Sequence, residues 1–120
     1  MSDLQTAAPE LGIDLSSRST IALPLVLLGD ADAGSRVRRA RQLESRGVRV
    51  SMARTGFEAI VKASCHIPDL ILLDGSLGDG EVLETTALLA MCPATAHIPV
   101  VRLMPGRRIP ARLLTGIAPR

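Results

Sequence analysis

The segment Pro68-Asp69-Leu70-Ile71-Leu72-Leu73-Asp74 decides the fold. Its unbroken apolar run, residues 70–73, is typical of a strand that is buried on both faces of a parallel sheet. Pro68 ends any helix that precedes it, and the glycine-rich loop 75–80 follows the strand directly. The sequence therefore predicts a central strand with Asp74 at its carboxyl end.

Further strand segments occur before and after this one, and helical periods separate them. The strand segments are residues 22–28, 48–52 and 98–103, and segment 48–52 alternates like a strand near a sheet edge. The helical segments are residues 34–46, 56–66 and 81–91. This alternation predicts an α/β fold with a flavodoxin-like open parallel sheet, strand order 2-1-3-4, joined by right-handed crossovers.

The composition is that of one globular domain. The chain has 120 residues, of which 47% are apolar, and a net charge of +2. Residues 1–20 show no sustained period, so we expect a flexible leader followed by a single domain over residues 21–120. The N-terminus lacks a secretory signal, and the longest apolar run, 21–28, is too short to span a bilayer. We expect a cytoplasmic protein without membrane contact.

Acidic side chains follow the ends of two predicted strands. Asp30 and Asp32 follow the first strand, and Asp74 ends the third. Ligand sites of open parallel sheets lie at the carboxyl ends of the strands, so we expect these carboxylates to converge. A hard cation such as Mg²⁺ would relieve their repulsion. The alternative is that they are solvated loop acids, with Asp32 capping the first helix.

Residues 24–104 resemble the receiver domain of bacterial two-component response regulators. The matching segments, in the family's order and near its spacing, are residues 26–32, 35–36, 47–48, 68–74 and 97–101. The resemblance implies that Asp74 is the phosphoacceptor of a phosphorelay, that a histidine kinase is the partner, and that Mg²⁺ is bound by Asp30, Asp32 and Asp74. A carboxylate nucleophile beside a divalent cation suits phosphoryl transfer.

The sequence departs from the family pattern at three positions of the site. The second acid after the first strand is replaced by Ala31, and the hydroxyl at the end of the fourth strand, the switch position, is replaced by Met104, which cannot donate a hydrogen bond. The only lysine, Lys62, lies in a helical segment. We therefore expect a pseudo-receiver, not an enzyme, that acts by protein–protein recognition, with ordinary phosphorylation of Asp74 as the alternative.

Other classes of function have weaker support. A small nucleotide- or phosphate-binding flavodoxin-like protein could use the loop 29–34, although this loop has neither a third glycine nor a Lys-Ser/Thr ending. A DNA-contacting module could use Arg36, Arg38, Arg39 and Arg41, which we interpret as a solvated helix surface. The single aromatic residue, Phe57, offers no platform for stacking bases, so nucleic acid is not an expected partner.

The segment after the fourth predicted strand is too short for another crossover. Only seven residues, 104–110, separate Leu103 from Ala111, and a crossover with its helix needs about ten to twelve. We expect the fourth and fifth helices of the receiver pattern to be missing, with at most a short fifth strand at residues 113–115. The sheet should then be incompletely covered, and a homodimer or another partner, rather than Leu4, Leu11, Ile13 and Leu15 of the leader, should cover it.

Overall fold

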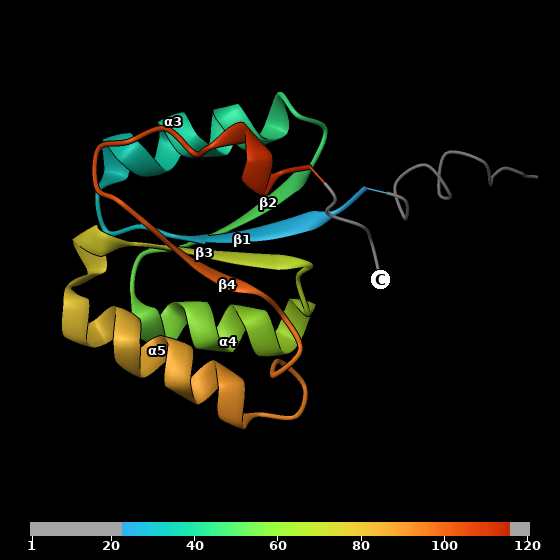
Figure 1. The fold of residues 1–120 in the computed structure, drawn as a ribbon, viewed down its shortest axis with the longest axis vertical. Coiled ribbons are helices and arrows are strands. Elements are labelled where there is room, and N and C mark those ends of the chain that lie inside the picture. The colour runs from blue at the N-terminus through green and yellow to red at the C-terminus, as the bar shows by residue number, and fades with distance from the viewer. Residues whose placement is uncertain (1–22, 116–120) are drawn as a thin grey trace, which may run out of the picture.

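Four parallel strands form the sheet, in the order β2-β1-β3-β4 (Figure 1). The computed structural model describes residues 23–115. The strands are β1 (Leu25–Gly29), β2 (Arg49–Ala53), β3 (Leu70–Asp74) and β4 (Val100–Leu103). Leu28 of β1 pairs with Met52 of β2 and with Leu72 of β3, and every strand pair is parallel. The order and the direction confirm the predicted flavodoxin-like sheet.

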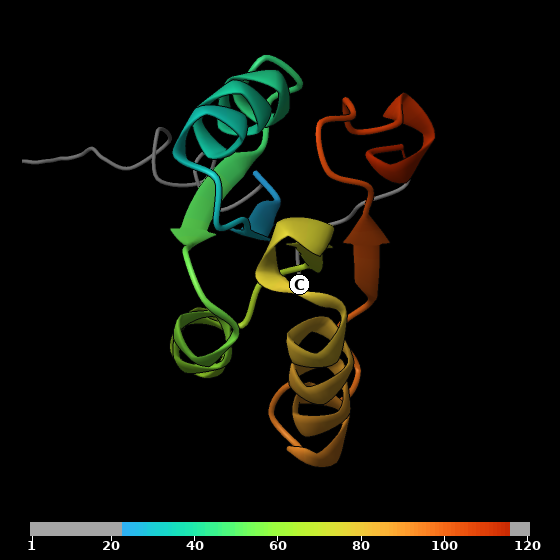
Figure 2. The same cartoon turned by 90° about the vertical axis from the view of Figure 1, so that its left-hand side faces the viewer.

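One helix covers one face of the sheet, and two helices cover the other (Figures 1 and 2). Helix α3 (Ala33–Glu44) lies on the first face, while α4 (Gly56–His66) and α5 (Asp79–Met91) lie on the second. The bounds of α4 are those predicted. Helix α3 begins where the Asp32 carboxylate accepts a hydrogen bond from the Ser35 amide at 2.7 Å, the capping role that was the alternative for this residue.

The central strands divide their side chains between two cores. Leu27 and Ile71 face α4 and α5, and both are buried. Leu28 and Leu72 face α3, and both are fully buried. Because a strand turns successive side chains to opposite faces, an unbroken apolar run is what a strand between two covered faces requires.

The segment after β4 turns back over the α3 face of the sheet (Figure 2). This return segment, residues 104–115, contains only the short 3-10 helix η2 (Ala111–Leu113), so no fifth strand is present within residues 23–115. Its Ile109 side chain is 2% exposed and packs in the core of the α3 face. The prediction of an incompletely covered sheet was therefore wrong for β1 and β3, because an irregular segment can bury apolar surface without the length of a helical crossover, whereas Val100 and Val101 of β4 are only half-buried.

Some predictions concern residues outside the described part of the chain. The leader, with its apolar residues at positions 4, 11, 13 and 15, lies outside residues 23–115. Within the described range, no helix is both long and apolar enough to cross a lipid bilayer. The predicted domain start at residue 21 is likewise outside the described residues.

Candidate functional site

Two buried carboxylates lie at the carboxyl edge of the sheet. Asp30 follows β1 and Asp74 ends β3, and their exposed fractions are 0% and 1%. The adjacent positions Gly29 and Leu73 are paired across the two strands, which places the acids side by side. A Cβ atom on Gly29 would lie only 2.9 Å from the Leu73 side chain, so glycine permits the strands to pack closely here. The predicted convergence therefore holds for Asp30 and Asp74.

The guanidinium group of Arg39 bridges these acids. Its Nη1 donates to Asp74 Oδ1 and, at 3.3 Å, to Asp30 Oδ2. Its Nη2 donates to the backbone carbonyls of Met104 and Arg107, both at 2.6 Å, and its Nε donates to the Arg107 carbonyl at 3.0 Å. Arg39 is 3% exposed. One buried cation thus joins helix α3, both strand ends and the return segment.

The carboxylate of Asp30 is surrounded by donors. Oδ1 accepts from the Asp32 amide at 2.9 Å and from the Ser76 hydroxyl at 3.1 Å. Oδ2 accepts from the Ser35 hydroxyl at 2.6 Å, in addition to Arg39. An ionised carboxylate has about four lone-pair directions, so Asp30 has little capacity for another ligand.

The other predicted site residues have different positions. Asp32 is exposed and lines the same cavity as Asp74, but its carboxylate accepts from the Ser35 amide instead of joining the ion pair between Arg39 and the buried acids. Met104 is 62% exposed and contributes only its backbone carbonyl. Lys62, on α4, donates to the Met52 carbonyl at 2.5 Å, so it is engaged outside the carboxylate cluster.

The carboxyl group of Asp74 is held in its ionised form. Burial by itself would raise its pKa, but hydrogen bonds from Ser76 and from Arg39, with the positive charge of Arg39, outweigh burial and lower the pKa below its usual value. The Ser76 amide donates to Oδ2 at 2.8 Å. Asp74 also borders a cavity of about 320 Å³ that Ser35, Arg38 and Ser76 help to line.

The arrangement does not fit a magnesium ion. Mg²⁺ requires oxygen ligands at about 2.1 Å in octahedral geometry. Arg39 lies between the two buried carboxylates that would bind the ion, and Asp32 is engaged at the helix N-terminus. Among residues 23–115, no group of three or more His, Cys, Asp or Glu side chains is placed to hold a metal. The positive charge that the acids need is therefore supplied by the chain itself.

Sequence reasoning missed three residues of this network: Ser35, Arg39 and Ser76. The four arginines of α3 were interpreted as solvated, which is wrong for Arg39 because its donors are all directed inward. A signal was available, since Ser35, Arg39 and Leu43 recur at intervals of four on one helix face and all three are buried.

The loop after β1 does not present a phosphate-binding backbone. The amides of Asp30, Ala31 and Asp32 donate to the Ala53 carbonyl, the Ser76 hydroxyl and the Asp30 carboxylate, respectively. A phosphate loop needs such amides directed at the ligand. The geometry thus gives no support to a nucleotide site at residues 29–34.

Comparisons with known structures define the class of protein. No protein-family profile and no curated protein matches the sequence. The fold is similar to the N-terminal domain of a response regulator receiver protein from Methanoculleus marisnigri JR1, at 29% identity, 74% coverage of this chain, 72% of that chain and a TM-score of 0.65. It is also similar to the non-phosphorylated HemR receiver domain of Leptospira biflexa, at 26% identity, 76% and 72% coverage and a TM-score of 0.59.

A response regulator from Desulfuromonas acetoxidans is similar as well, at 25% identity, 75% coverage of both chains and a TM-score of 0.59. The sheet order and the strand direction match the fold of these neighbours. The chain has a receiver-domain fold and is similar to the receiver domains of response regulators. A receiver role in two-component signalling is the function that this similarity supports.

Proposed function

We propose that this chain is a pseudo-receiver, in which Asp74 keeps the phosphoacceptor position but serves as one end of a permanent ion pair. The observation that carries the proposal is the bridge from the Arg39 guanidinium to both Asp30 and Asp74. In this reading Arg39 replaces the divalent cation, and the surface of the domain, rather than a phosphate, carries the signal.

Charge and burial support the proposal. A phosphoryl donor must approach Asp74 Oδ1 or Oδ2, but Arg39 occupies the first and the Ser76 amide the second. Displacing Arg39 would leave a buried guanidinium without its partners, at a cost of about 3–5 kcal/mol. The departures at Ala31 and Met104 act in the same direction, since they remove a metal ligand and a hydroxyl donor.

The function that follows is recognition, not catalysis. We propose that a histidine kinase or another signalling protein of a two-component pathway binds the domain in the cytoplasm, and that binding does not depend on phosphorylation. A receiver domain that is held in one state by an internal cation has no phosphate-dependent population to shift. Partner binding should then be the same for the wild type and for variants of Asp74 that fold.

The experiment is a mass measurement. The wild-type chain is incubated with Mg²⁺ and acetyl phosphate beside a phosphorylatable receiver domain as the positive control, and intact masses are recorded before the acyl phosphate can hydrolyse. We expect the control to gain one phosphate and this chain to gain none. A phosphate added to the wild type but not to Asp74→Asn would overturn the proposal and establish ordinary phosphorylation.

A further inference from the structure

A second cavity lies between helix α3 and the return segment, next to the carboxylate site. Its volume is about 430 Å³, within the range of small-molecule pockets, roughly 300–1,000 Å³. Two sides of it are formed by α3 and by residues 106–108. The side chains and glycine that line it are Ser35, Arg38, Arg39, Arg41, Gln42, Gly106, Arg107 and Arg108. No carboxylate is among them.

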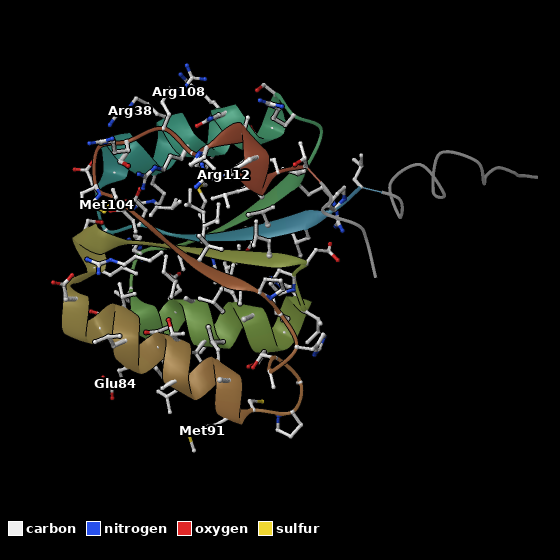
Figure 3. All side chains as sticks on the ribbon, in the orientation of Figure 1. Arg38, Glu84, Met91, Met104, Arg108 and Arg112 are labelled. Carbon is white, nitrogen blue, oxygen red and sulfur yellow. The ribbon has the colours of Figure 1, made fainter. Side chains whose placement is uncertain are left out.

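Four of these arginines have free guanidinium groups. Arg38 and Arg41 come from α3, and Arg107 and Arg108 come from the return segment. Within residues 23–115, none of the four side chains makes a hydrogen bond or an ion pair, and all four residues are exposed. Arg38 and Arg108 lie on the same side of the molecule, with Glu84 and Met91 on the opposite side (Figure 3).

Such a gathering of like charges is unfavourable without an anion. Each pair of unit charges repels by about 0.5 kcal/mol at roughly 8 Å in water, and more where solvent is partly excluded. The charges cannot separate freely, because Arg39 and Gln42 fasten the return segment to α3. Gln42 donates to the Ile109 carbonyl at 2.7 Å and accepts from the Ile109 amide at 3.0 Å. The two pairs of arginines are therefore held facing one cavity.

We propose that this cavity binds a small molecule that carries two or more linked phosphate groups. Each guanidinium matches phosphate oxygens through paired N–H donors, and four of them suit a ligand with several negative charges. None of the lining residues is aromatic, so the cavity contacts the phosphates rather than a base. An acidic protein segment would be the alternative occupant, but a cavity of about 430 Å³ is of the size that small ligands occupy.

Binding at this cavity would strengthen the attachment of the return segment. A ligand that contacts Arg38 or Arg41 and also Arg107 or Arg108 links α3 to the same segment that Arg39 holds. A ligand that binds only the folded chain stabilises it by mass action, so the melting temperature should rise with ligand concentration. The inference does not rest on the proposed function, since it requires neither phosphorylation nor its absence.

The test uses isothermal titration calorimetry with sodium tripolyphosphate as the probe, at 150 mM NaCl. The double variant Arg38→Ala/Arg108→Ala removes one arginine from each side of the cavity. The matched control, Arg46→Ala/Arg54→Ala, removes the same charge from exposed positions that do not line it. We expect saturable wild-type binding, at least tenfold weaker binding by the cavity variant, and less than a twofold change in the control.

Three outcomes would overturn the proposal: no wild-type binding at millimolar probe, equal weakening in both double variants, or binding of an oligoglutamate peptide without binding of tripolyphosphate. Equal weakening would mean attraction by net charge alone. A thermal-unfolding series on the same variants, followed by circular dichroism, verifies that each is folded. Because all four substituted arginines are exposed, we expect each variant to fold, so weaker binding reports on the cavity.

Discussion

The two faces of the sheet are covered in different ways. On one face, α4 and α5 pack regular apolar surfaces against Leu27, Ile71 and Leu73. On the other face, α3 covers only part of the sheet, and the irregular return segment covers the rest. The return segment owes its position to one buried apolar residue, Ile109, and to polar contacts from two α3 side chains, Arg39 and Gln42.

The comparison of the two faces shows how a short irregular segment can replace regular secondary structure as the cover of a sheet. A helix satisfies its own backbone, so a helical face needs only apolar packing. An irregular segment must find partners for its carbonyls and amides, and here the α3 side chains supply them. The charge that holds the segment also neutralises the carboxylate site, so Arg39 contributes both to the covering of this face and to the chemistry of the site.

The largest effect should come from the residue that both regions share. Replacing Arg39 with Ala leaves Asp30 and Asp74 buried together without a cation and removes the donors to the Met104 and Arg107 carbonyls. We expect a loss of about 3–5 kcal/mol in the free energy of unfolding, measured in urea by circular dichroism.

The matched control for that prediction is the adjacent exposed residue. Arg38→Ala removes the same charge from the same helix and should change the free energy of unfolding by less than about 0.5 kcal/mol. Equal losses in the two variants would show that Arg39 does not hold the buried acids and the return segment together.

The apolar anchor of the return segment should have the next largest effect. Ile109→Ala opens a cavity among Leu28, Leu72 and Leu103, and we expect it to cost about 2–4 kcal/mol in the same urea measurement. Leu83→Ala, at a position of α5 that is 72% exposed, is the control and should be nearly neutral. If the two variants unfold at the same urea concentration, the return segment does not cover the sheet in solution.

The effect of Gln42 should be smaller and local. Gln42→Ala removes both hydrogen bonds to the Ile109 backbone, each worth about 1 kcal/mol. We expect hydrogen exchange of the Ile109 amide to become about tenfold faster or more. The exchange rate of the Ile71 amide, which donates to the Pro99 carbonyl within the sheet, should not change. If hydrogen exchange of both amides accelerated equally, the substitution would have destabilised the whole fold, and Gln42 would not hold the return segment locally.

The smallest effect is the pH dependence that comes from Asp74. Its pKa is lowered in the folded chain, so the folded state holds fewer protons than the unfolded state between the two pKa values. This contribution to stability is present above the unfolded pKa of about 3.9 and is lost as the pH falls through the folded pKa. Stability of the wild type should therefore fall more steeply in acid than that of Asp74→Asn. The exposed Glu84→Gln variant should keep the wild-type slope, and equal slopes in all three proteins would contradict the pairing of Asp74.

The sheet could be predicted from the sequence because its signals are local. The apolar run at residues 70–73 and the helical period at 56–66 each indicate one structure on their own. The position of Asp74 at a strand end then placed it beside Asp30. These inferences need only periodicity and the geometry of parallel sheets.

The contacts that Arg39 makes could not be predicted, because they join residues that are far apart in the sequence. Arg39 and Arg107 are separated by 68 positions, and nothing in a run of arginines shows which one turns inward. The prediction that the α3 face of the sheet is incompletely covered failed for a related reason. The expectation assumed that only a helix could bury the sheet, whereas Ile109 and the Gln42 contacts do so within a segment too short for one.

In the proposed pseudo-receiver, Arg39 takes the place of a divalent cation between Asp30 and Asp74. The most direct test is a titration of the ¹⁵N-labelled wild-type chain with Mg²⁺, followed through the amides of Ala31 and Ser76, which donate to the Ser76 hydroxyl and to Asp74 Oδ2. We expect that neither amide resonance shifts in a saturable manner up to about 10 mM Mg²⁺, a concentration above the roughly millimolar dissociation constants of weak carboxylate sites. A saturable shift of both resonances, absent from Asp74→Asn, would show that the wild-type site binds the metal and that Arg39 does not replace it.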